Sequence, residues 1–165
     1  MQTVIPMMRK QRGGIIVNIT SLGGRISFPL NSAYHATKFA LEGLSEPIQY
    51  ELEPFVIKII VIEPGGVSSN FLKNLKMATK TSDPFKSPYR LIESSMSEYF
   101  KQWVQNTIHP SEVAKIILQA VIADNPDFSY IVGKDAAMML ETRRSMSDRE
   151  FQDMITQQFN LQNIS

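Results

Sequence analysis

Short apolar runs and longer amphipathic stretches alternate along this chain. Residues 15–20 (IIVNIT) and 58–62 (KIIVI) are rich in β-branched side chains and predict buried strands. Between them, over residues 32–53, apolar side chains recur three and four positions apart, which predicts a helix with Asn31 and Ser32 at its start. A strand, a helix and a second strand in this order predict a right-handed crossover unit of a parallel sheet.

Pro47 interrupts the pattern of the predicted 32–53 helix. Inside a helix, proline removes a backbone hydrogen bond and costs about 3 kcal/mol. The sequence therefore predicts either a kink at Pro47 or a helix that ends earlier than its apolar pattern does.

The rest of the chain carries further helical patterns and one more strand. Residues 68–87 are polar and contain proline breakers, so they predict a loop. An aromatic and methionine stripe over 89–103 and an apolar stripe after Pro110 predict two helices. Residues 129–132 predict the last strand, and 136–165 a polar helical tail that frays. The fold class indicated is α/β, with three parallel strands and flanking helices.

Composition narrows the class of protein. The 165 residues are 43% hydrophobic and 20% charged, which is typical of a globular chain. A net charge of +1 gives no electrostatic argument for nucleic-acid binding. The absence of cysteine excludes disulfides, thiolate catalysis and cysteine-ligated zinc. No run of about eighteen apolar residues occurs, so we expect no membrane span and a cytoplasmic location.

Tyr34 and Lys38 are the candidate chemical pair. Four residues apart near the start of a helix, they lie on one face and one turn apart. An ammonium beside a phenol favours its ionised form, so the pair could transfer a proton near neutral pH. The same spacing recurs from Tyr130 to Lys134, on a predicted strand, where residues four apart lie about 13 Å apart. The spacing alone is therefore weak evidence.

The surroundings of Tyr34 and Lys38 strengthen the prediction. Ser21 follows the strand at 15–20, and Pro64-Gly65 follows the strand at 58–62. In open parallel sheets, ligands bind outside the carboxyl ends of the strands. The sequence therefore predicts one site at this edge of the sheet.

Other polar residues give weaker indications. His35 is expected to point away from Tyr34, and His109 precedes a proline. Neither histidine has a second ligand at metal-binding spacing, so no metal site is predicted. The neighbouring carboxylates are scattered and predict no paired-carboxylate site: Glu51, Glu53 and Glu63.

Together these residues resemble the short-chain dehydrogenase/reductase family. Its pattern is an apolar strand ending near a serine, Tyr-x-x-x-Lys on a long helix, another strand and a Pro-Gly turn. The resemblance covers residues 1–135 and implies the C-terminal part of a Rossmann-type domain, with 136–165 as a tail. Two features depart from the family: the chain has no N-terminal Gly-rich cofactor motif, and Ser69 stands where a threonine is usual.

The resemblance implies an oxidoreductase that moves a hydride between NAD or NADP and an alcohol or carbonyl compound. Tyr34 would donate or accept the oxygen proton, Ser21 would hydrogen-bond that oxygen, and Lys38 would assist Tyr34 and bind the nicotinamide ribose. The backbone of the Pro-Gly turn would seat the nicotinamide. The implied catalytic residues are Ser21, Tyr34 and Lys38, and the implied cofactor residues are Tyr34, Lys38, Pro64, Gly65, Gly66, Val67 and Ser69.

The family also implies a substrate-covering segment, here residues 68–105, and oligomers formed through the long helix at 32–53. The aromatic stripe within 89–103 suits an apolar small-molecule substrate, but it equally suits packing on the core. Both interpretations stay open at this stage.

Two other functions compete with an active enzyme. A chain without the pyrophosphate-binding motif is expected to bind the cofactor poorly. It would then be a truncated, inactive product that acts at most as a dimerising module. A non-enzymatic regulator with this fold is a weaker alternative. A site that no longer catalyses a reaction would have no physical need for all three of Ser21, Tyr34 and Lys38.

Overall fold

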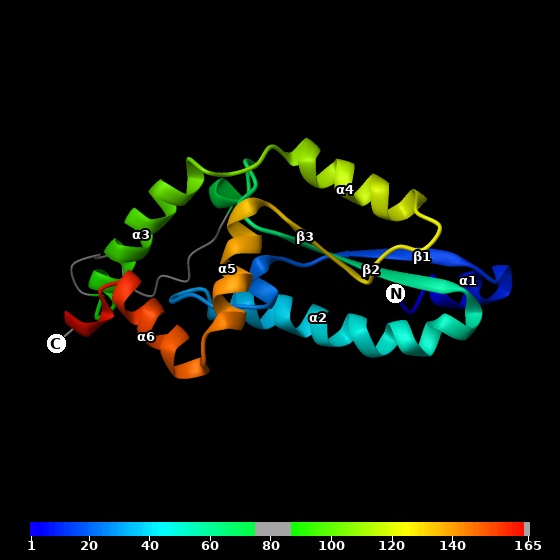
Figure 1. Ribbon diagram of the computed structural model, residues 1–165, viewed down its shortest axis with the longest axis horizontal. Helices are drawn as coiled ribbons and strands as arrows, with labels where there is room; N and C mark the ends of the chain where they lie inside the picture. Colours follow the sequence, from blue (N-terminus) through cyan, green and yellow to red (C-terminus); the bar gives the residue numbers. More distant parts are fainter. Residues whose placement is uncertain (75–86, 164–165) are drawn as a thin grey trace.

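Three parallel strands in the order β1-β2-β3 form the sheet of this protein (Figure 1). The computed structural model describes residues 1–74 and 87–163; residues 75–86 of the predicted loop lie outside this range. The strands are β1 at Gly14–Ile19, β2 at Ile57–Pro64 and β3 at Ser129–Val132. Val17 pairs with Ile60, and Ile62 pairs with Tyr130. The predicted α/β class and all three predicted strands are confirmed.

Helices cover both faces of the sheet (Figure 1). Alternate residues of β2 point to opposite sides: Ile59 and Val61 pack toward α2 and α1, whereas Ile60 and Ile62 pack toward α4. No helix in the described part of the chain is long and apolar enough to cross a membrane. The helices are α1 (Ile5–Gln11), α2 (Ser32–Leu52), α3 (Arg90–Val104), α4 (Pro110–Ile122), α5 (Lys134–Ser145) and α6 (Asp148–Gln158).

Helix α2 is continuous through Pro47, so the prediction of an early end is wrong. Its buried face extends to both sides of the proline: Ser45 lies before it and Leu52 after it. The Ser45 hydroxyl also accepts a hydrogen bond of 2.8 Å from Asn18 of β1. Tertiary packing on the sheet outweighs the local preference of proline.

Residues 148–161 pack on the protein, so the prediction that the tail frays is wrong for these residues, whereas residues 164–165 lie outside the described part of the chain. Phe151, Ile155 and Phe159 recur four residues apart along α6 and its end, and all three are buried. They join one hydrophobic cluster with Met96 of α3 and Leu140 of α5. A narrow apolar stripe is enough to bury a helix whose average composition is polar.

Candidate active site

A cavity of about 340 Å³ lies at the carboxyl ends of β1 and β2. Ser21, from the loop after β1, and Tyr34 and Lys38, from the first turns of α2, share its wall. Gly66 is the one predicted site residue outside the lining, because its N–H points to Asp135. The other predicted cofactor residues of the turn after β2 line the cavity: Pro64, Gly65, Val67 and Ser69.

Ser21 is held between two strand ends. Its hydroxyl oxygen accepts a 3.0 Å hydrogen bond from the Gly23 N–H, which caps the short helical turn at Leu22–Gly24. The hydroxyl also donates a long 3.5 Å bond to the Pro64 carbonyl. A bond of this length is weak, so the hydroxyl can turn toward a ligand oxygen without losing much.

Lys38 lies beside Tyr34 in the cavity wall. Its ammonium nitrogen is 5.8 Å from the centre of the Tyr34 ring and donates to the Ile19 carbonyl at 3.0 Å. Burial lowers the pKa of Lys38 below its ordinary value. A lysine ammonium has three donors, so two remain for other partners. The ring of Tyr34 also packs edge-on against Phe71, 5.6 Å between centroids.

His35 has a structural role that sequence reasoning missed. Its side chain is buried, and its ring lies 5.7 Å from the Tyr34 ring rather than away from it. Nε2 accepts from the Phe28 N–H at 2.9 Å, so Nδ1 carries the proton and donates to the Gly23 carbonyl at 2.8 Å. His35 thus ties the loop that carries Ser21 to the helix that carries Tyr34. The sequence pattern carries no signal for this, since both partners are backbone groups of an irregular loop.

Aromatic side chains close the other side of the cavity. Phe28 and three residues of α3 (Tyr99, Phe100 and Trp103) line it, while Met96 of the same helix is buried in the core. The stripe on α3 therefore contributes both to the wall of the cavity and to the hydrophobic core. Burial, followed by the Asp135 carboxylate, raises the pKa of Tyr99, so this wall stays uncharged at neutral pH.

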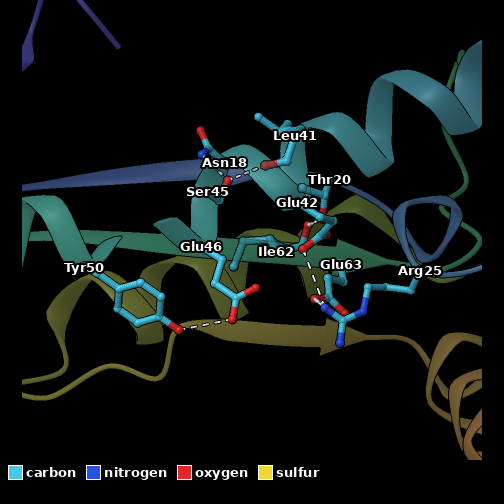
Figure 2. A network of polar contacts seen from close by, with 10 residues as sticks. All are labelled: Asn18, Thr20, Arg25, Leu41, Glu42, Ser45, Glu46, Tyr50, Ile62 and Glu63. Carbon is cyan, nitrogen blue, oxygen red and sulfur yellow. Dashed lines mark hydrogen bonds and ion pairs between the residues drawn. The ribbon is translucent and has the colours of Figure 1, made fainter. Parts of the chain in front are cut away.

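Two buried carboxylates, Glu42 and Glu63, lie close to each other and to Arg25 (Figure 2). Glu63 follows Val61 on the face of β2 that packs on α2, where it approaches Glu42; sequence reasoning found no such pair because these residues are 21 positions apart. Arg25 lies 3.9 Å from Glu42 and 3.8 Å from Glu63. One oxygen of each carboxylate has no hydrogen-bond partner among the described residues. Burial raises the pKa of both carboxyls, and Glu42 raises that of Glu63 further.

We predict that this acidic pair makes the protein more stable in mild acid. Both folded-state pKa values lie above the ordinary 4.5, so the pair is favourable below that pH and loses stability as pH rises through the raised values. Glu63→Gln removes the buried ionisable group and should therefore increase the free energy of unfolding at pH 8, with the gain shrinking toward pH 5. Urea titrations of the 165-residue chain between these two pH values measure the change.

The exposed Glu51, on the helix that carries Glu42, supplies the control. Glu51→Gln should leave the pH dependence of stability unchanged. A Glu63→Gln chain that is less stable than wild type at pH 8 would contradict the prediction and show that the Arg25 ion pair dominates.

Comparison with known proteins agrees with the fold. Residues 1–80 match the family model described as short chain dehydrogenase. The 3-ketodihydrosphingosine reductase of Bacteroides thetaiotaomicron is 34% identical over an aligned length of 138 residues, and the match covers 80% of this chain and 48% of that protein.

Two solved structures share the fold. A short-chain dehydrogenase from Streptomyces avermitilis superposes with a TM-score of 0.69 at 28% identity, over 98% of this chain and 55% of that one. A short-chain dehydrogenase from Burkholderia cenocepacia in complex with NADP superposes with a TM-score of 0.60 at 19% identity, over 88% and 47%. The chain belongs to the short-chain dehydrogenase family, and it spans about half the length of the relatives named here.

Proposed function

We propose that the whole protein is an NAD- or NADP-dependent oxidoreductase that interconverts an alcohol and a ketone or aldehyde. One observation carries the proposal: Ser21, Tyr34 and Lys38 line a single cavity at the carboxyl ends of β1 and β2. This arrangement offers a hydroxyl, a phenol and an ammonium to one small ligand. The family membership of the chain supports the same reaction class.

Each of the three residues has a separate role in the proton transfer. Tyr34 passes a proton to the carbonyl oxygen in reduction and removes it in oxidation. Ser21 donates a hydrogen bond to that oxygen, which its weak bond to Pro64 permits. Lys38 places a positive charge beside the Tyr34 ring, which favours the phenolate that forms as the proton leaves.

The residues that line the cavity suit the nicotinamide end of the dinucleotide cofactor. The free donors of Lys38 fit ribose hydroxyls, and the turn at Pro64, Gly65 and Val67 presents backbone with little side-chain bulk to the cavity. A Cβ on Gly65 would collide with the Asp135 carboxylate unless that carboxylate moved. When bound, the reduced cofactor would supply the hydride for carbonyl reduction, and the oxidised cofactor would accept it in alcohol oxidation. The NADP complex of a protein with the same fold supports this group of cofactors.

An apolar substrate fits the cavity best. Its wall is aromatic on the side of α3, where Tyr99, Phe100 and Trp103 lie. Apolar contact area of this kind favours a long-chain or ring-shaped carbonyl compound over a small polar one. The name of the relative from Bacteroides thetaiotaomicron, a ketodihydrosphingosine reductase, supports the same class.

Ser21→Ala tests the proposal. Loss of one donor to the reacting oxygen should lower kcat of the whole protein about a hundredfold, measured by the absorbance of the reduced nicotinamide with a panel of apolar ketones. Ser32→Ala, at the exposed first residue of α2, is the control and should keep wild-type turnover. Wild-type kcat in Ser21→Ala would remove Ser21 from the mechanism. No turnover with either cofactor on any ketone or alcohol would overturn the proposed function.

We also propose that the protein forms a homo-oligomer through α2 and that it is located in the cytoplasm. The outer face of α2 exposes Phe39, Leu44 and Tyr50, which gives a second copy apolar surface to cover. A chain without cysteine suits a reducing compartment.

A further inference from the structure

Asp135, in the first turn of α5, holds three separate elements together. One carboxylate oxygen, Oδ2, accepts the N–H of Gly66 at 2.6 Å, from the turn after β2. The same oxygen accepts the indole N–H of Trp103 at 3.3 Å, from α3. In the sequence, Asp135 lies 69 positions after Gly66 and 32 positions after Trp103. It thus links the turn after β2 to the aromatic wall of the cavity.

The backbone around Asp135 leaves room for its carboxylate and for the indole. A Cβ on Gly65 or on Gly133 would collide with the carboxylate of Asp135. A Cβ on Gly66 would lie 2.9 Å from the Trp103 ring. Gly133 also has φ of 108°, a conformation that side chains other than glycine rarely adopt. The close approach of turn, carboxylate and indole therefore depends on glycine at each of these three positions.

The position of Asp135 on its helix suits a carboxylate. Residues in the first turn of a helix face the positive end of its dipole, which favours a negative charge there. The second oxygen of Asp135, Oδ1, is buried and has no hydrogen-bond partner among the described residues. Such a group is retained at a cost in stability, which points to a role for the two bonds made by Oδ2.

We propose that Asp135 is a positioning residue that fixes the Trp103 wall of the substrate cavity against the turn at 64–67. Trp103 lines the cavity, and so do Pro64, Gly65 and Val67, whereas Asp135 does not. Asp135 therefore acts through its two N–H partners. It sets the distance between the side of the cavity that receives the apolar substrate and the side that receives the nicotinamide. The consequence for catalysis rests on the proposed function; the link between Asp135 and Trp103 does not.

The first test measures the link without any activity assay. Trp103 is the only tryptophan of the 165-residue chain, so intrinsic fluorescence reports on it alone. Asp135→Leu replaces the acceptor with a larger apolar side chain, and Asp135→Asn keeps an acceptor oxygen at nearly the same volume. We expect a shifted Trp103 emission and about twofold faster quenching by acrylamide in Asp135→Leu, with Asp135→Asn close to wild type. Lys134→Ala, exposed on the neighbouring position, is the control. Identical quenching in the Leu and Asn variants would overturn the proposal.

The second test measures the consequence in the whole protein. Asp135→Leu should raise KM for an apolar ketone about tenfold, the loss expected for one hydrogen bond to a charged group, while kcat changes less. Asp135→Asn should restore KM. A tenfold fall in kcat with unchanged KM would contradict a positioning role. If no substrate turns over at all, the proposed function fails, and the fluorescence test still decides the link.

A third variant covers the case in which Asp135→Leu does not fold. Trp103→Phe keeps an aromatic wall but removes the N–H donor, and it should raise KM in the same direction as Asp135→Leu. If Asp135→Leu folds, the double variant Trp103→Phe with Asp135→Leu should have a KM less than about twofold above that of Trp103→Phe. The reason is that both substitutions remove the same hydrogen bond, from the Trp103 indole to the Asp135 carboxylate. Wild-type KM in Trp103→Phe would overturn the proposal.

Discussion

Tyr34→Phe is expected to lower kcat of the whole protein about a thousandfold, because phenylalanine lacks the hydroxyl that transfers the proton. The effect should be confined to the chemical step. Lys38 keeps its bond to the Ile19 carbonyl, and within the described residues no hydrogen bond joins the Tyr34 hydroxyl to the turn after β2. Cofactor affinity, measured by fluorescence of the reduced nicotinamide, should stay within about twofold of wild type.

The chain contains its own matched control for this experiment. Tyr130 and Lys134 have the same spacing as Tyr34 and Lys38, but Tyr130 lies on β3 and Lys134 begins α5. The Tyr130 hydroxyl accepts a hydrogen bond from the Asp127 N–H at the far end of β3 from the cavity. Tyr130→Phe should therefore keep wild-type kcat. Turnover of Tyr34→Phe within tenfold of wild type would remove Tyr34 as the proton donor.

Phe159→Ala is expected to lower the free energy of unfolding by about 3–5 kcal/mol, although Phe159 lies close to the last residue, Ser165. The side chain is fully buried in the cluster formed by α3, α5 and α6. Its ring meets Tyr99 at 5.0 Å and Phe28 at 6.0 Å between centroids. Removal leaves a cavity that these neighbours can fill only in part, and urea unfolding of the 165-residue chain measures the loss.

Gln158, the preceding residue, is exposed and provides the control. Gln158→Ala should change stability by less than about 0.5 kcal/mol. A loss below about 1 kcal/mol in Phe159→Ala would show that the C-terminal segment is not part of the cooperative core. Because Phe28 and Tyr99 also line the cavity that contains Ser21 and Tyr34, we expect the C-terminal segment to support the site as well as the fold.

Glu42 and Glu63 illustrate why some buried polar contacts escaped prediction. Alternation along β2 places Glu63 on the α2 face, after Val61. The helical period places Glu42 on the buried face of α2. Each position follows from its own element, but which helix covers which strand, and in what register, is a property of the packed protein.

Local sequence patterns predict the strands, the helix that carries Tyr34 and Lys38, and the position of Ser21 after a strand. Hydrophobic periodicity records which face of each element is buried, and the rule for parallel sheets then places the strand ends at one edge. The roles of His35, Asp135 and Phe159 depend on contacts between residues distant in sequence and on backbone groups of irregular loops. No periodicity encodes such contacts, because they form only when helices and turns pack against one another.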